Sequence, residues 1–297
     1  MPPMSPMTNE ADADGTDNPS REFEFTNADF ERVRKLIYQH AGISLAPVKQ
    51  NMVYSRLARR LRARNCPSFS IYLAELERGN PAEMEVFVNA LTTNLTSFFR
   101  EAHHFDILCE HLQKIGGQAS TANPLRIWCS AASTGEEPYT LAITACEAFG
   151  TLTPPVAIIA SDIDTNVLET ARRGVYPMDR VEKLSSERLR SFFLKGNGAQ
   201  TGQARVRPEL QKLVNFTRVN LLDERWPNVP GPLDVIFCRN VMIYFDKETQ
   251  YRILKKFAPL LRDDGLLFAG HSESFMHAAD LFHSLGRTVY ELANRKR

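Results

Sequence analysis

The spacing of apolar residues divides the chain into two parts of different character. Between residues 23 and 90 apolar side chains recur every three or four positions, which is the spacing of amphipathic helices. Helices are predicted at residues 27–42, 47–65 and 81–91. Thr26 and Asn80 are N-capping residue types, and Gly42 favours a helix end. A small helical domain is therefore expected at residues 23–90.

After Pro124 short apolar runs alternate with amphipathic stretches. The expected strands are 125–129, 156–160, 233–238, 266–269 and 288–292, and the expected helices are 137–149, 165–173 and 247–261. Strands that alternate with helices in this way are typical of a parallel sheet with helices on both faces. The fold class is therefore α/β, with a doubly wound, Rossmann-like domain after the small helical one.

The stretch from about residue 174 to residue 216 interrupts this alternation. It contains a glycine-rich turn at 196–202, and residues 204–207 and 213–216 show partial alternation of apolar and polar side chains. We interpret this stretch as an inserted small β-subdomain that contains a β-hairpin. The expected domains are a disordered, Pro- and Asp-rich tail at 1–22, the helical domain at 23–90, and a larger domain at 91–297 with a linker at 91–123.

The distribution of charge points to an acidic partner. The net charge of the whole chain is only +1, but residues 32–74 contain nine Lys or Arg and no Asp or Glu. The rest of the chain therefore carries −8, and a basic surface on a mildly acidic body suits an acidic partner. The five cysteines are widely spaced and the first residues lack an apolar signal segment, so we expect a reduced, cytoplasmic protein.

The first strand-to-helix turn, residues 129–138, contains small residues, one glycine and two carboxylates. In an open parallel sheet the ligand binds at this edge. A dinucleotide enzyme would place the sequence G-x-G-x-x-G and a pyrophosphate here. Glu136 and Glu137 would repel a pyrophosphate but suit the ammonium and sulfonium charges of S-adenosylmethionine. Alternatively, the two glutamates only complement the dipole of the next helix.

Two further turns carry polar side chains at strand ends. Asp162 lies 27 positions after Gly135, where a carboxylate is placed to bind ribose hydroxyls, whereas Asp164 is expected to cap the next helix. Arg239 and Asn240 directly follow a buried strand, at the place where a transferase binds its acceptor. Structural hydrogen bonding is the alternative role for these two residues.

The segment before the first strand interleaves Asn94, Thr96 and Arg100 with aromatic residues at the junction of the two domains. Domain junctions are favoured positions for ligands, although a capped helix start would have the same residue types. The nearby histidines and Cys109 match no zinc-binding spacing, so no metal is expected.

Together these motifs resemble one family, the CheR chemotaxis receptor glutamate O-methyltransferases. The resemblance runs from about Phe25 to Leu292, and its most specific pieces are TTNLTSFFREAHHF, ASTGEEPY, ASDID, FCRNVMIYFD and GLLFAGHSE. It implies a helical N-terminal domain, a domain that binds S-adenosylmethionine, and an inserted β-subdomain. The family lacks the G-x-G-x-G of other methyltransferases and has the AASTGEE turn in its place.

The resemblance also implies roles for individual residues. The residues expected to bind the cofactor are Asn94, Thr96, Arg100, Glu136, Asp162, Asn220, Leu221, Arg239 and Asn240. Arg100 and Tyr244 would lie nearest the transferred methyl group and act as catalytic residues. The product would be S-adenosyl-L-homocysteine, and no metal would take part.

The implied reaction is O-methylation of glutamates on the cytoplasmic helical bundle of a chemoreceptor, for adaptation in chemotaxis. The insert of some family members docks a peptide at the receptor C-terminus, which is an expected partner here too. We expect a monomer that neither enters a membrane nor binds nucleic acid.

The basic helix at residues 53–64 is the expected receptor-binding element. Its arginines Arg56, Arg59, Arg60 and Arg62 are predicted to bind the substrate. A solvated face is the usual fate of a run of charges, and an Arg stripe that tracks phosphates would make the protein an RNA methyltransferase instead. A sensor that binds S-adenosylmethionine without catalysis is a third interpretation.

Overall fold

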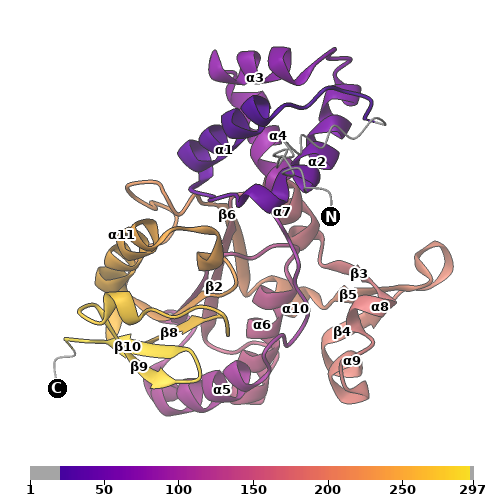
Figure 1. Ribbon diagram of the computed structural model, residues 1–297. Helices are drawn as coiled ribbons and strands as arrows, with labels where there is room; N and C mark the ends of the chain where they lie inside the picture. Colours follow the sequence, from indigo (N-terminus) through magenta and orange to yellow (C-terminus); the bar gives the residue numbers. More distant parts are fainter. Residues whose placement is uncertain (1–20, 295–297) are drawn as a thin grey trace, which may run out of the picture.

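The computed structural model describes residues 21–294, and its first part is a bundle of helices (Figure 1). These helices are α1 (Asn27–Ala41), α2 (Gln50–Ala63), α3 (Phe69–Glu77) and α4 (Pro81–Leu91). The predicted helices are confirmed, with Thr26 capping α1 and Asn80 capping α4. Helix α3 was not predicted, although its buried residues at positions 69, 72, 73 and 76 have helical spacing. Of the predicted tail, residues 1–20 lie outside the described residues.

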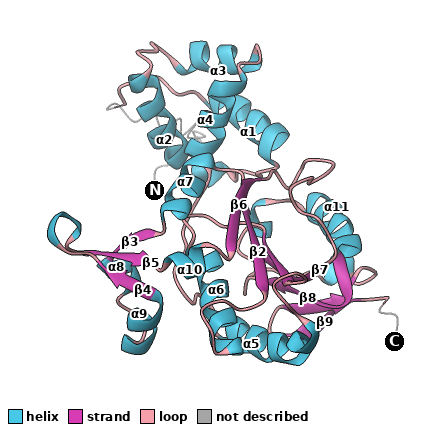
Figure 2. Ribbon diagram, turned by 180° about the vertical axis from the view of Figure 1, so that it is seen from behind, coloured by secondary structure: helices cyan, strands magenta, loops and turns pink. Residues whose placement is uncertain are grey.

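The second part is a seven-stranded sheet with strand order β6-β2-β1-β7-β8-β10-β9 (Figures 1 and 2). The strands are β1 (Leu125–Cys129), β2 (Val156–Asp162), β6 (Val214–Arg218), β7 (Leu233–Cys238), β8 (Leu261–Ala269), β9 (Phe282–Gly286) and β10 (Val289–Leu292). The first five are parallel to one another, and β9 and β10 form a hairpin at one edge in which β10 runs antiparallel to both β8 and β9. All five predicted strands are confirmed.

Helices cover both faces of this sheet. Side chains that alternate along each strand enter two separate apolar cores, so Ile127 packs with α5 (His103–Ile115) and α6 (Glu136–Phe149), whereas Trp128 packs with α11 (Lys247–Phe257). Helix α7 (Thr165–Arg173) follows β2. This arrangement is the predicted doubly wound α/β fold. In residues 21–294 no helix has the length and apolar character needed to span a bilayer.

The insert forms a separate three-stranded sheet with order β3-β5-β4. Its elements are β3 (Val175–Pro177), α8 (Met178–Val181), α9 (Ser186–Phe192), β4 (Phe193–Lys195), β5 (Gln203–Val206) and α10 (Pro208–Gln211). The predicted β-hairpin is confirmed, since β4 and β5 pair antiparallel on the two sides of the glycine-rich turn at 196–202. Residues 213–216 lie outside this hairpin. Val214 pairs with Ile158 in the large sheet, because β6 is its parallel edge strand and alternates for that reason.

Gly135 forms the turn between β1 and α6 and lies against the insert. Its φ is +98°, and a Cβ placed there would come within 2.7 Å of the Tyr176 hydroxyl and 2.9 Å of the Ala171 Cβ. The Tyr176 hydroxyl donates a 2.8 Å hydrogen bond to the Thr134 carbonyl. The insert and the turn therefore hold each other in place.

We predict that Gly135→Ala lowers the free energy of unfolding by about 2–5 kcal/mol, since it adds left-handed strain to steric overlap. Gly150 is the control, because it ends the same helix at φ +64° with nothing within 4 Å of a Cβ. Gly150→Ala should cost only about 1–2 kcal/mol. Urea unfolding measures both, and equal losses would contradict the packing argument.

Candidate functional site

A cavity of about 540 Å³ lies where the carboxyl ends of β1, β2 and β7 meet the helical bundle. Ser130, Asp162 and Arg239 line it from the ends of these strands, and Lys49, Met52 and Arg56 line it from the bundle. Its volume is in the range of sites that bind a small molecule or cofactor. Because both parts of the chain contribute to its wall, the cavity is a junction site, as the position of the 94–100 segment suggested.

Most of the predicted residues line this one cavity. They are Asn94, Thr96, Arg100, Asp162, Asn220, Leu221, Arg239, Asn240, Tyr244 and Arg56. Glu136 does not line it: its Oε2 accepts a 2.6 Å hydrogen bond from the Thr134 hydroxyl, and its Oε1 lies 3.5 Å from an Arg180 nitrogen. Glu137, its neighbour in the same turn, lines the cavity instead.

Asp162 is fixed at the end of β2 by backbone donors. Its Oδ2 accepts from the Ser133 N–H at 2.8 Å and its Oδ1 from the Asp164 N–H at 3.0 Å. Burial raises its pKa to about 6, although these hydrogen bonds oppose the shift. The result is a carboxylate that is held rigidly, largely out of water, at the cavity wall.

Asp164 caps α7, as predicted, and also ties the segment before α5 to the sheet. Its Oδ1 accepts from the Asn166 N–H, and its Oδ2 accepts from the Asn94 amide and the Thr92 hydroxyl, both at 2.9 Å. The Asn94 side chain therefore has a structural partner at the cavity wall. Asn220 likewise donates from its amide to the His40 carbonyl at 2.7 Å.

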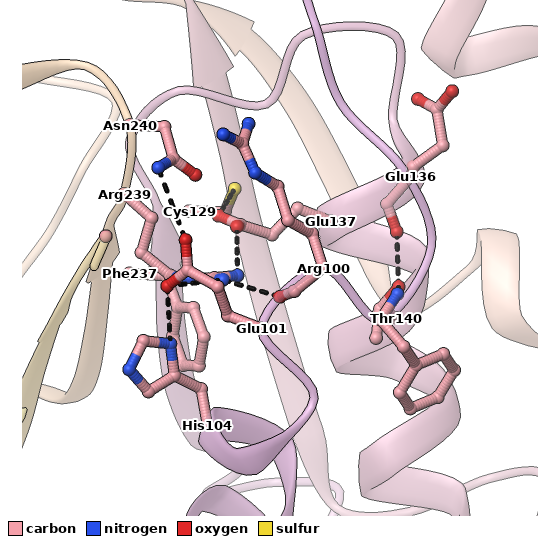
Figure 3. A network of polar contacts seen from close by, with 12 residues as sticks. Arg100, Glu101, His104, Cys129, Glu136, Glu137, Thr140, Phe237, Arg239 and Asn240 are labelled. Carbon is pink, nitrogen blue, oxygen red and sulfur yellow. Dashed lines mark hydrogen bonds and ion pairs between the residues drawn. The ribbon is translucent and has the colours of Figure 1, made fainter. Parts of the chain in front are cut away.

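Arg239 is the centre of a buried polar network (Figure 3). Its guanidinium is fully buried, lies 2.7 Å from a Glu137 oxygen and 3.2 Å from a Glu101 oxygen, and donates to the Arg100 carbonyl. Figure 3 shows Glu101 and Glu137 pointing toward this group, whereas the carboxylate of Glu136 points away from it. The network joins the end of β7, the start of α6 and the segment before α5.

The two acids respond to Arg239 in different ways. Burial raises the pKa of Glu101, but the charge of Arg239 and hydrogen bonds from His271 outweigh it and bring the pKa to about 2. Glu137 is more deeply buried, so its pKa stays raised although Arg239 opposes the shift. Glu101 was not selected from the sequence, and of the two glutamates noted in the 129–138 turn only Glu136 was included among the expected cofactor-binding residues. For Glu137 the signal was present, since it adjoins Glu136 in the same turn.

The four predicted receptor-binding arginines have different environments. Arg56 lines the cavity and donates to the Leu91 and Thr92 carbonyls at 3.0 and 2.6 Å, while Arg60 forms a two-pronged pair with the buried Glu83. Arg62 pairs with Glu22 at the surface. Arg59 is exposed, three residues after Arg56 on the helix. The acidic partners come from outside the basic segment 32–74.

No described group of three or more His, Cys, Asp or Glu side chains, within residues 21–294, is arranged to hold a metal ion. A cavity at the carboxyl ends of a doubly wound sheet, with a fixed carboxylate after the second strand, places the protein among the α/β enzymes that bind a nucleoside-containing cofactor.

Comparison with known proteins narrows this class. The all-alpha domain of CheR methyltransferases matches residues 28–92, and their SAM binding domain matches residues 94–291. Chemotaxis protein methyltransferase 2 of Pseudomonas aeruginosa is 54% identical, over 92% of this chain and 96% of its own. The chemotaxis protein methyltransferases of Salmonella typhimurium and Escherichia coli are 53% and 49% identical, over 91% and 90% of this chain and 92% of each of theirs. The chain belongs to the CheR methyltransferase family and is an S-adenosylmethionine-dependent methyltransferase.

The cavity suits this cofactor. Asp162 offers a carboxylate to hydroxyl donors, and Val219, Leu221 and Ile163 offer an apolar surface for an aromatic base. S-adenosylmethionine supplies a methyl group on a positively charged sulfur.

We predict that Glu137→Ala lowers the free energy of unfolding by about 3–5 kcal/mol, because it leaves the buried Arg239 charge without its closest partner. The control is Glu147→Ala, which removes the carboxylate from the half-exposed pair with Arg188 and should cost less than about 1 kcal/mol. Guanidinium chloride unfolding measures both variants. Similar losses of unfolding free energy in the two variants would show that burial does not make the Arg239 pair more stabilising than a surface pair.

Proposed function

We propose that the enzyme transfers the methyl group to glutamate side chains on the cytoplasmic helical bundle of a bacterial chemoreceptor. The observation that carries the proposal is the continuity of one cavity. It joins Asp162 to Arg100 and Tyr244, and reaches Arg56 on the basic helix α2. A cofactor bound at the sheet and a receptor helix bound beside α2 would meet at Arg100 and Tyr244. The names of the closely similar chemotaxis methyltransferases support the choice of acceptor.

The chemistry requires positioning more than proton transfer. A glutamate with a pKa of about 4.3 is ionised at pH 7, so its oxygen attacks the methyl group without a general base. Holding two reactants in line supplies roughly 7–11 kcal/mol of the barrier. Arg100, whose Nη1 is anchored on the Leu95 carbonyl at 3.0 Å, and Tyr244 would orient the acceptor. Too strong an ion pair with the acceptor would stabilise the ground state and slow the reaction.

For the cofactor we propose that Asp162 binds the ribose, that Asn220 and Leu221 flank the adenine, and that Arg239 and Asn240 complete the pocket. Asn94, Thr96 and Arg100 would contact the cofactor from the segment before α5. Glu136 is not retained in this set, because its carboxylate is directed to Thr134 and Arg180.

Receptor binding would use the exposed part of the basic helix. Arg59 continues the cavity-lining row of Lys49, Met52 and Arg56 and has no acid paired with it among the described ion pairs, so it is the strongest candidate for contact with receptor glutamates. Arg56 and Arg60 are engaged within the bundle, which weakens the alternative of a continuous phosphate-tracking stripe for RNA.

The insert would provide a second receptor contact. Strand β4 lies at the edge of the small sheet, so one side of its backbone is open to pairing with a peptide strand. A receptor C-terminal peptide is the proposed occupant.

The test is transfer of labelled methyl groups from S-adenosylmethionine to receptor-containing membranes. We expect label that base releases, because methyl esters of glutamate hydrolyse in base and N-methyl groups do not. Arg59→Ala should lower kcat/KM for the receptor about threefold or more without changing cofactor affinity, which corresponds to a surface contact of about 0.7 kcal/mol.

Arg78→Ala is the matched control for this experiment, since Arg78 is another exposed arginine of the same bundle, at the end of α3. It should leave kcat/KM unchanged. Label that resists base, or no label on any receptor, would refute the proposed acceptor, and equal effects of the two arginine variants would refute the role of Arg59.

The raised pKa of Asp162 predicts a pH dependence of cofactor binding. Ribose hydroxyls donate to the ionised carboxylate, so binding favours the charged form and weakens as the group is protonated below its pKa of about 6. Titration calorimetry should show affinity for S-adenosylmethionine falling about tenfold between pH 7 and pH 5. Asp162→Asn should bind more weakly at pH 7 and lose this dependence. The same slope in the variant would exclude Asp162 as its source.

A further inference from the structure

The turn at residues 240–244 carries two of the cavity residues, Asn240 and Tyr244. Asn240 has a left-handed backbone with φ +58°, which turns the chain sharply away from β7. Residues Met242–Tyr244 then form one turn of 3₁₀ helix. The Tyr244 side chain is half-buried, packs against the apolar core of the helical bundle, and lines the cavity. Where Tyr244 lies therefore depends on what holds this turn.

The N–H groups of the turn converge on one carboxylate, that of Glu273. Its Oε1 accepts from the N–H groups of Val241, Met242 and Ile243 at 2.9, 2.7 and 3.3 Å. Its Oε2 accepts from the Asn240 N–H at 2.9 Å and the Gly270 N–H at 2.5 Å. Glu273 is only 4% exposed. Five backbone donors thus meet two oxygens of a single buried side chain.

No ion pair of the described residues includes Glu273. Its charge is therefore balanced by backbone dipoles, and burial raises its pKa against those hydrogen bonds. Burying a carboxylate without a cation beside it costs free energy. Water or a neutral oxygen would accept hydrogen bonds from the same N–H groups at a lower cost. The buried Glu273 carboxylate is therefore best explained by a need to hold the 240–244 turn in one geometry.

The opposite side of the turn is held as well. The buried Gln250 of α11 donates from its Nε2 to the Met242 carbonyl at 2.9 Å and to the Phe245 carbonyl at 3.0 Å. Gly270 allows its own loop to approach the 240–244 turn closely, since a Cβ at this position would lie 2.4 Å from the side-chain amide nitrogen of Asn240. Glu273 therefore binds the N–H groups of the turn, and Gln250 binds its carbonyl groups.

We propose that Glu273 is a positioning residue for methyl transfer, which fixes the 240–244 turn so that Tyr244 is presented to the acceptor. This role rests on the proposed function of Tyr244. Glutamine at position 273 has nearly the same shape, but it replaces one accepting oxygen with an NH₂ group that faces backbone N–H donors. Glu273→Gln should therefore shift the turn without opening a cavity in the core.

The experiment measures kcat, the KM for receptor and the dissociation constant of S-adenosylmethionine for wild type, Glu273→Gln, Tyr244→Phe and the double variant. Displacing a positioning element by about 1 Å costs on the order of 100-fold in rate. We expect Glu273→Gln to lower kcat by about that factor while cofactor affinity changes less than about threefold. Tyr244→Phe should lower kcat in the wild-type background and have little further effect in the Glu273→Gln background.

Asp234→Asn is the matched control, because Asp234 is also a buried carboxylate that accepts from a backbone N–H, that of Arg126 at 2.7 Å, but at the start of β7. It should reduce stability and leave kcat unchanged. Gln250→Leu is the second variant and should repeat the kcat loss. If Glu273→Gln does not fold, an unchanged kcat in Gln250→Leu overturns the proposal.

The remaining outcomes are also decisive. Multiplicative effects of Glu273→Gln and Tyr244→Phe, or a kcat loss in Asp234→Asn equal to that in Glu273→Gln, would reduce Glu273 to a stabilising residue. A wild-type kcat in Glu273→Gln overturns the role while the proposed function stands. Wild-type enzyme that labels no receptor overturns the proposed function, and the role of Glu273 falls with it.

Discussion

The buried guanidinium of Arg239 is the interaction on which the arrangement of the site depends. It comes from the end of β7 and binds Glu137 at the start of α6 and Glu101 in the segment before α5. Removing a partner from a buried charge is strongly destabilising, so the contacts of Arg239 favour one relative position of these three segments. That requirement explains why a stretch without regular structure, residues 92–102, holds a defined course between the helical bundle and the sheet.

Periodicity predicted the regular elements well because it records burial directly. Residues 125–129 and 233–238 are confirmed as strands to the residue, since their apolar runs, broken only by Arg126 and Asp234, reflect cover on both faces. The same principle failed at 213–216. Alternation shows that one face of a strand is covered but does not identify the neighbouring strand, and here the neighbour was β2 rather than β5.

Site residues that directly follow a strand could be predicted from the sequence. Residues whose contacts depend on how helices pack and rotate could not. Asp162, Arg239 and Asn240 line the cavity because carboxyl ends of parallel strands share one edge. The choice between Glu136 and Glu137 depends on helix rotation, which the sequence does not contain. The arginines of α2 looked unpaired because Glu22, Glu75 and Glu83, which meet Arg62, Arg64 and Arg60, lie outside the acid-free segment.

The contact between Gly135 and Tyr176 bears on how the insert can diverge among relatives. The base of the insert shares its apolar core with the large sheet, through residues such as Tyr176, Phe193 and Val206, and it abuts the turn beside the cofactor cavity. Its glycine-rich tip at 196–202 is largely exposed. A change in the length or sequence of the tip would leave this apolar core intact, whereas a change at the base would disturb the catalytic domain itself. The tip of the insert is structurally independent of the catalytic domain, whereas the base of the insert is part of its apolar core.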